Sequence, residues 1–145
     1  MSRILKRKGL ELTEENRAIR IKMEVRRAEE SLKAATLLLE SDLYDESISS
    51  AYYSIFHMTK AILITIGEDP ATHQGLITLF TLNFIKSKII ESEYSDILIE
   101  AKEDRETSDY DAAKQFSKED AKEKHESAIK FKNRILAYLN EKRCL

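Results

Sequence analysis

The chain has 145 residues, of which 42% are hydrophobic and 34% charged, with a formal net charge of -2, three glycines and one proline. This length suits one domain with its own core, and the scarcity of turn residues argues against an all-β fold. The single cysteine, Cys144, excludes a disulfide framework within the chain, and no apolar run has the length of a signal peptide or a membrane span. We therefore expect a cytoplasmic, all-α protein that does not enter a membrane.

The charge is unevenly distributed along the chain. Residues 1–27 carry nine Lys and Arg against four Asp and Glu, whereas residues 91–126 carry six against thirteen. Mixed charge runs are typical of the solvated faces of surface helices, which is one interpretation. The other is a basic face for RNA phosphates and an acidic face for a partner.

Helical periodicity begins after a basic arm at residues 1–12, so that residues 13–145 are expected to form a single helical domain. A first helix is predicted over residues 14–41, with apolar side chains at three- and four-residue steps (Val25, Ala28, Leu32, Ala35 and Leu39). A second is predicted over residues 43–66, with Asp42 as its N-cap and Gly67 as its stop. Its low polarity indicates that it lies at the centre.

Three further helices follow in chain order. Thr72 is a suitable cap for a helix over residues 73–87, and Ser92 opens one over residues 93–108. Ser117 and Asp120 resemble a capping box at the start of a last helix, which extends to about residue 141. Short connections favour antiparallel neighbours, so the predicted fold is an antiparallel up-and-down bundle of about five helices.

The fourth helix carries an arginine on its apolar side. The stripe of Tyr94, Leu98 and Ala101 continues at the next helical step to Arg105. A charge there must be paired or face a cavity, and Asp109 lies one turn further on. One interpretation is a partly buried ion pair that only ties the bundle together.

The second helix carries polar residues in series, because Ser49, Tyr53, His57 and Lys60 fall on one face. We expect these side chains to line a wet groove with Arg105 and Tyr110, with His73 nearby. A single histidine on a helix is more often structural than catalytic, although its pKa suits proton transfer.

Several other kinds of site are not indicated. The three histidines follow no metal-ligand spacing, and the sequence has no glycine-rich phosphate loop. We therefore expect no metal and no cofactor.

Four segments in a fixed order resemble a known family. They are residues 51–57 (AYYSIFH), 60–63 (KAIL), 72–75 (THQG) and 105–110 (RETSDY). Together they are similar to the UPF0332 branch of the HEPN proteins, over about residues 22–140. The resemblance implies an antiparallel helical bundle that forms a homodimer and has a minimal nucleotidyltransferase as its partner in a toxin–antitoxin pair.

The resemblance also implies a reaction, since many HEPN proteins are metal-independent RNases that use an Arg followed after four to six residues by a His. In this sequence Arg105 is followed by Asp109 and Tyr110, with no His through Gln115. Two hypotheses therefore stay open. The first is a module that binds RNA, a nucleotide or a partner protein through Tyr53, His57, Lys60, His73, Arg105, Asp109 and Tyr110.

The second hypothesis is an RNase toxin, in which Arg105 binds the phosphate and His57 or His73 moves the proton. A tyrosine is a poor base at neutral pH, so Tyr110 is not expected to replace the missing histidine. Under either hypothesis, a partner nucleotidyltransferase would make Tyr110 a candidate for nucleotidylation.

Overall fold

The computed structural model describes residues 6–7, 10–11, 14–110 and 115–145, and of residues 6, 7, 10, 11 and 110 only the backbone. Within these ranges the chain forms five α-helices: α1 (Glu14–Glu40), α2 (Tyr44–Ile64), α3 (His73–Phe80), α4 (Glu93–Tyr110) and α5 (Lys118–Glu141). The predicted all-α bundle is confirmed. Ahead of α1, the two-residue strands β1 (Lys6–Arg7) and β2 (Leu10–Glu11) pair antiparallel. They fall in the segment expected to be a basic arm, whose other residues lie outside the described part.

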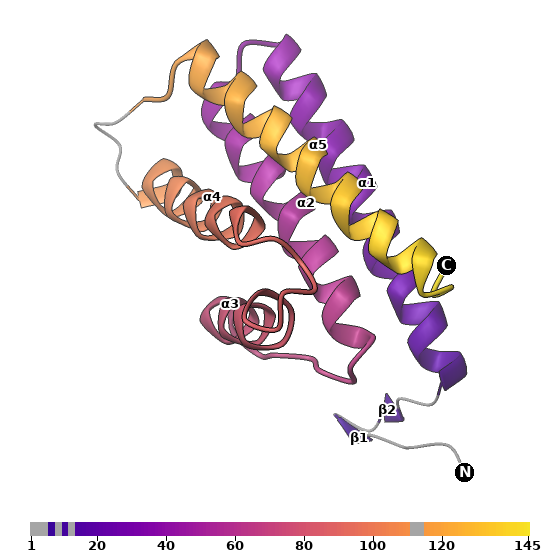
Figure 1. The fold of residues 1–145 in the computed structure, drawn as a ribbon. Coiled ribbons are helices and arrows are strands. Elements are labelled where there is room, and N and C mark those ends of the chain that lie inside the picture. Colours follow the sequence, from indigo (N-terminus) through magenta and orange to yellow (C-terminus); the bar gives the residue numbers. More distant parts are fainter. Residues whose placement is uncertain (1–5, 8–9, 12–13, 111–114) are drawn as a thin grey trace.

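Helix α2 lies at the centre of the bundle, as its low polarity predicted. It packs against each of the other four helices, with α1 and α5 running beside it along the long axis and α4 crossing at one side (Figure 1). Its Tyr52, Met58 and Ile62 are fully buried. Despite this apolar core, none of the helices within the described ranges combines the length and the hydropathy needed to span a membrane.

Small residues allow α1 and α2 to approach closely. Ala28 and Ala35 of α1 are fully buried, and the Ser47 hydroxyl of α2 donates a hydrogen bond to the Ala35 carbonyl oxygen at 2.8 Å. Close contact of two backbones requires short side chains where they cross. This contact fixes the rotation of α2 and therefore decides which of its side chains face α1.

Most of the predicted helix ends are confirmed. The Thr72 hydroxyl accepts a hydrogen bond from the Gly75 N–H at 2.9 Å, and Ser117 and Asp120 form a complete capping box. Gly67 has a φ of 76°, the left-handed conformation that commonly follows a helix end.

Asp42 is a correction, because it does not cap α2. Leu43 occupies the N-cap position and provides no side-chain cap. Asp42 has a φ of 61° and its N–H donates to the Leu39 carbonyl oxygen, so it ends α1 instead. Aspartate tolerates this left-handed conformation because its short polar side chain can hydrogen-bond locally, and here it accepts from the Tyr44 hydroxyl.

The third predicted helix changes its pitch partway along. After α3 the chain continues as a π-helical turn, η1 (Thr81–Ile85). The Asn83 side-chain amide donates to the Leu79 carbonyl oxygen at 2.8 Å and so occupies an acceptor of the helical ladder. Phe80 and Phe84 both remain buried, which keeps this segment attached to the core.

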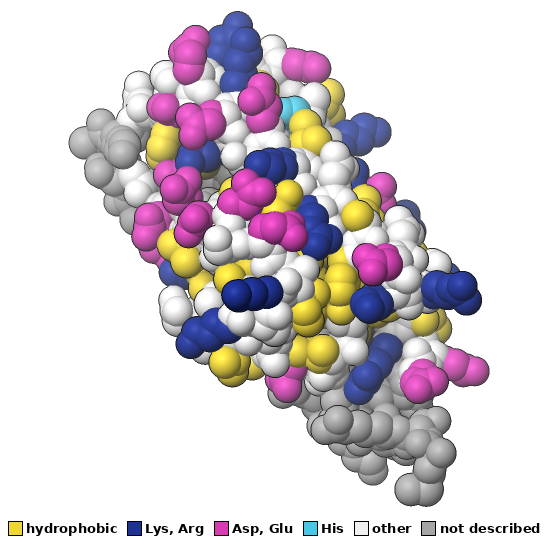
Figure 2. Space-filling model, viewed as in Figure 1, with side chains coloured by type: hydrophobic (Ala, Val, Ile, Leu, Met, Phe, Trp, Pro, Cys, Tyr) yellow, Lys and Arg dark blue, Asp and Glu magenta, His cyan; other side chains and the backbone are white. Residues whose placement is uncertain are grey.

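The acidic segment of the sequence forms a visible part of the surface. Asp and Glu side chains gather over α4 and the beginning of α5, at the upper left of the view (Figure 2). These helices belong to the segment 91–126, whose sequence is rich in Asp and Glu.

Candidate functional site

The side chains of the 51–57 segment contact different parts of the structure, although the residues are neighbours on α2. Tyr52 is fully buried, whereas Tyr53, Phe56 and His57 are only partly buried. Successive helical residues are about 100° apart, so the four rings cannot share one environment. We refer to Ser49, Tyr53, Phe56, His57 and Lys60 as the α2 strip, which lies between α1 and α4.

Arg105 contacts the α2 strip from α4. Its guanidinium carbon lies 5.5 Å from the centroid of the Tyr53 ring, and its Nε lies 3.0 Å from a carboxylate oxygen of Asp109. The ion pair predicted between Arg105 and Asp109 is therefore present. The other oxygen of Asp109 accepts a hydrogen bond from the Ser49 hydroxyl at 3.3 Å, which ties this pair to α2. The Arg105 guanidinium is thus held over an aromatic face, an arrangement that favours a cation.

His73, the first residue of α3, lies on the aromatic side of the α2 strip. Its ring stacks on Phe56 with centroids 4.7 Å apart, and its Nδ1 lies 2.5 Å from the Tyr52 hydroxyl oxygen. Burial raises the pKa of Tyr52 well above its ordinary value, so this hydroxyl keeps its proton. Burial also lowers the pKa of His73, and the positive charges of Arg105 and Lys102 lower it further. His73 is therefore mostly neutral near pH 7, and its Nδ1 shares a hydrogen bond with the Tyr52 hydroxyl.

His57 forms its hydrogen bond on the α1 side of the strip. Its Nδ1 lies 2.7 Å from one carboxylate oxygen of Glu24, a residue of α1 that is only 4% exposed. The other oxygen of Glu24 accepts from Arg27 at 3.0 Å and lies 3.9 Å from the Lys60 ammonium. Burial by itself would raise the pKa of Glu24, but the hydrogen bond from His57 and the charges of Lys60 and Arg27 hold it below its usual value. Glu24 is therefore a buried carboxylate whose desolvation is offset by contacts with His57, Arg27 and Lys60.

Sequence reasoning missed Glu24. It lies three residues after Ile21 and four before Ala28, both buried, so a carboxylate stands within the apolar stripe of α1. A charge at such a position needs partners, since an unpaired buried ion costs several kcal/mol. That interruption of the stripe was the signal that could have identified it.

The site residues predicted from the sequence thus form two groups joined at Tyr53. Arg105, Asp109 and Ser49 form the group at α4, with His73 close enough for the Arg105 charge to act on its pKa. His57 and Lys60 form the group at Glu24, and the Lys60 ammonium also lies 5.5 Å from the centroid of Phe56. The backbone of α4 extends to Tyr110, but the side chain of Tyr110 lies outside the described residues.

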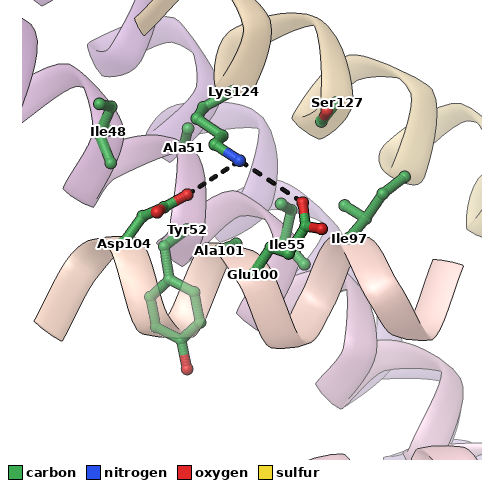
Figure 3. Close-up of a pocket in the computed structure, with 10 residues that line it drawn as sticks. All are labelled: Ile48, Ala51, Tyr52, Ile55, Ile97, Glu100, Ala101, Asp104, Lys124 and Ser127. Atoms are coloured by element: carbon green, nitrogen blue, oxygen red, sulfur yellow. Dashed lines mark ion pairs between the residues drawn. The ribbon is translucent and has the colours of Figure 1, made fainter. Parts of the chain in front are cut away.

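A separate cluster supports α4 from the side of α5. Lys124 extends from α5 to Asp104 and Glu100 of α4, at 3.0 and 3.5 Å, above a cavity of about 10 Å³ (Figure 3). Tyr52 lines the same cavity, and its hydroxyl points away from Lys124. A cavity of this size holds about one water molecule and no organic ligand. This cluster therefore fixes the position of α4, and with it that of Arg105.

The chemistry of the strip is that of an aromatic and cationic surface. Its partly buried rings are Tyr53, Phe56 and His57, and His73 of α3 stacks on Phe56. The cations at these rings are Lys60, Lys102 and Arg105. Ring faces stack with nucleobases and guanidinium groups bind phosphates, so such a surface suits a single-stranded nucleic acid or a nucleotide.

Comparison with known proteins agrees with the family resemblance of the sequence motifs. The model of the HEPN domain family matches residues 21–142. Two proteins of Methanocaldococcus jannaschii, both named "Putative toxin", are 36% and 38% identical to the chain over 121 and 114 residues. These matches cover 83% and 79% of the chain and 82% and 84% of the two relatives.

A third relative carries a family name. A UPF0332 protein of Pyrococcus horikoshii is 41% identical over 85 residues, which are 59% of the chain and 60% of that protein. A UPF0332 protein of Archaeoglobus fulgidus is 34% identical over 99 residues and is covered over 78% of its length. The chain therefore belongs to the HEPN domain family and is a homologue of the UPF0332 proteins.

Proposed function

We propose that this protein is a toxin-like HEPN module that binds RNA or a nucleotide along the α2 strip. One observation carries the proposal: the Arg105 guanidinium over Tyr53, next to the neutral His73 stacked on Phe56. A phosphate bound by Arg105 would place the attached base against these rings. Stacking on an aromatic side chain contributes about 1 to 3 kcal/mol per base and depends little on its identity.

The names of the two archaeal relatives support a role in a toxin–antitoxin pair. We infer that the protein forms a homodimer and has a minimal nucleotidyltransferase as its partner, which is what the family resemblance implies. Tyr110 at the end of α4 is then the candidate for nucleotidylation. Elution of the two purified proteins as one complex in size-exclusion chromatography would support the pairing, and separate elution at micromolar concentration would contradict it.

A metal-independent RNase is the second candidate, and one observation favours it. The charge of Arg105 acts on the pKa of His73, whereas His57 is paired with Glu24. Of the two histidines considered as substitutes for the missing one, His73 is therefore the stronger. In this reaction Arg105 would stabilise the negative charge developing on the phosphate, and His73 would transfer a proton.

The experiment measures binding and cleavage together. A fluorescent single-stranded RNA is titrated with the wild type, Arg105→Ala and His73→Ala in EDTA, by fluorescence anisotropy, and the samples are then run on a gel. We expect Arg105→Ala to weaken binding about tenfold, because it removes the charge that contacts the phosphate. Arg134→Ala is the matched control, since Arg134 is as exposed as Arg105 but pairs with Glu91 at another part of the surface.

The outcomes separate the two candidates. Equal binding by the wild type and Arg105→Ala would contradict the proposed site. Cleavage by the wild type that is lost in both Arg105→Ala and His73→Ala would establish the RNase. Binding without cleavage would leave the binding module as the function.

A further inference from the structure

A second groove lies on the other side of Tyr53, between α1 and α2. It is open to solvent and has a volume of about 320 Å³. Its lining is Arg27, Glu30, Ser31 and Ala34 of α1 and Ser50, Tyr53 and His57 of α2, and the Glu30 carboxylate is paired with Arg26 at 3.1 Å. This volume is at the lower end of the range for small-ligand sites, about 300 to 1,000 Å³. Because Tyr53 also lies under the Arg105 guanidinium, the same ring belongs to both the groove and the site at α4.

The orientation of the His57 ring in this groove is fixed by its contact with Glu24 of α1. Glu24 is ionised and buried, and its oxygen 2.7 Å from Nδ1 accepts the proton that this nitrogen carries. The contact with Glu24 is made at Nδ1, and the His57 side chain also lines the groove. The ring is also held edge-on against Phe56, with centroids 5.2 Å apart. A histidine held in this way presents one defined nitrogen to a ligand, at little entropic cost.

The groove combines the groups that recognise a nucleoside. Tyr53 provides an aromatic wall, Ser31 and Ser50 provide hydroxyls, and His57 provides a ring nitrogen. Hydroxyls and a ring nitrogen suit the 2′-hydroxyl of a ribose, which both donates and accepts hydrogen bonds. Because the groove is open to solvent, its shape suits one nucleotide of a single-stranded nucleic acid better than an isolated small molecule that has to be enclosed.

We propose that the α1–α2 groove is a second nucleotide subsite, which takes the base and ribose adjacent to the phosphate bound by Arg105. His57 contacts this nucleotide through Nε2, and Glu24 is the positioning residue that holds His57. The inference rests on the proposed function, because it requires the first phosphate to bind at Arg105. The inference extends the proposed function by giving the path of the nucleic-acid strand, which crosses Tyr53 from α4 toward α1.

The test compares a mononucleotide with a dinucleotide. Adenosine 5′-monophosphate and the 5′-phosphorylated diadenylate are titrated separately into the ¹⁵N-labelled protein in EDTA, and dissociation constants are obtained from chemical-shift changes. For the wild type we expect the dinucleotide to bind about tenfold more tightly than the mononucleotide, the gain expected from one more stacked nucleotide.

Three variants locate this gain. His57→Ala and Glu24→Gln are expected to reduce it below about threefold, because the second nucleotide then loses its contact with a correctly held His57. The unchanged affinity for the mononucleotide is expected of a variant outside the α2 strip. Because Glu24 is buried and Glu24→Gln leaves its cations uncompensated, Ala34→Gln is the third variant. It narrows the groove without altering the pair of Glu24 and His57, and it is also expected to abolish the gain.

The matched control is His125→Ala. His125 is a partly buried helical histidine that also bonds to α1, through Thr36 at 2.7 Å, and it does not line the groove. This variant is expected to keep the full gain. A general loss of structure would weaken the binding of both ligands, whereas loss of the second subsite would weaken the binding of the dinucleotide alone.

Two outcomes would overturn the inference, and they are distinguishable. If the mononucleotide binds and depends on Arg105, but the dinucleotide shows no gain or a gain that His57→Ala and Ala34→Gln leave intact, the groove is not a subsite and the proposed function stands. If neither ligand binds, or binding is insensitive to Arg105→Ala, the proposed function fails as well.

Discussion

At the scale of the residue, adjacent side chains of α2 acquire different chemical properties from different neighbours. Tyr52 is hydrogen-bonded to His73, Tyr53 lies under Arg105, Phe56 stacks on His73, and His57 is hydrogen-bonded to Glu24. Two histidines of one chain therefore have opposite surroundings. His57 is hydrogen-bonded to an anion, whereas His73 is hydrogen-bonded to a neutral hydroxyl. The charges of Arg105, Lys102 and Lys60 lower the pKa of His73, and the charge of Glu106 opposes them.

The pKa of His73 provides a direct prediction. It lies below the ordinary value of 6.5 because of burial and then because of the Arg105 charge. We expect Arg105→Met to raise the pKa of His73 toward 6.5, and Arg105→Lys to leave it near its value in the wild type. An NMR titration of the imidazole resonances measures both, with His125 as the internal control. A pKa of His73 that is the same in all three proteins would contradict the electrostatic contact with Arg105.

The sign of the effect on stability follows from the same shift. Because the folded state lowers the pKa of His73, it favours the neutral imidazole more than the unfolded chain does. This contribution to the free energy of unfolding is fully present above pH 6.5 and is lost as the pH falls through the lower pKa of the folded state. The loss on acidification is therefore expected to be smaller in Arg105→Met.

At the scale of the element, the position of α4 is the feature on which the site depends. This helix contacts α2, α3 and α5, and the cluster of Lys124, Asp104 and Glu100 connects it to α5. Burial by itself would lower the pKa of Lys124, but the contact that its ammonium makes with Asp104 and the charges of both carboxylates raise this pKa above its usual value, so the ammonium stays protonated. The side chains of Lys124 and Asp104 are each only about one fifth exposed, so water screens this ion pair less than it screens a pair on the open surface.

This arrangement predicts the result of a double-mutant cycle. We expect Lys124→Met to lower the free energy of unfolding by about 1 to 3 kcal/mol, because it leaves Asp104 partly buried without its cation. The double variant Lys124→Met with Asp104→Leu is expected to recover most of that loss, since two apolar side chains replace the pair. Urea denaturation measures both. A double variant less stable than Lys124→Met alone would contradict this account of the cluster.

At the scale of the whole molecule, charge and apolar surface are divided between faces. Acidic side chains gather over α4 and the start of α5, whereas α1 carries exposed apolar side chains, among them Ile19, Met23 and Leu37. Exposed apolar groups along one helix are frequent where a second protein chain binds. This distribution is compatible with the homodimer that the family resemblance implies.

The dimer is tested on the chain alone. We expect light scattering after size-exclusion chromatography to give twice the mass of one chain at micromolar concentration. Met23→Glu tests whether the interface lies on this face of α1, which also carries Arg27 and Ala34 of the α1–α2 groove. We expect the variant to remain dimeric, and a shift toward the monomer would place the interface over the groove and contradict the second subsite. A wild-type protein that remains monomeric over the accessible range of concentrations would exclude the dimer.

The sequence by itself determined what depends on neighbours within one or two helical turns. Apolar spacing predicted five helices to within a few residues, and local polar chemistry predicted the caps at Thr72 and Ser117 and the pair of Arg105 and Asp109. The family motifs were also visible, because they are fixed in order and spacing. Asp42 shows where local reasoning fails, since a left-handed backbone let it end one helix instead of starting the next.

Only the tertiary structure decided which helices face one another and at what rotation. The close approach of α1 and α2 at Ala28, Ala35 and Ser47 turns His57 toward Glu24, and the position of α3 brings His73 to Tyr52. These contacts join residues 33 and 21 positions apart. Helical periodicity says which side chains share a face but not which face of another helix they meet, because that choice belongs to the packing of the whole core.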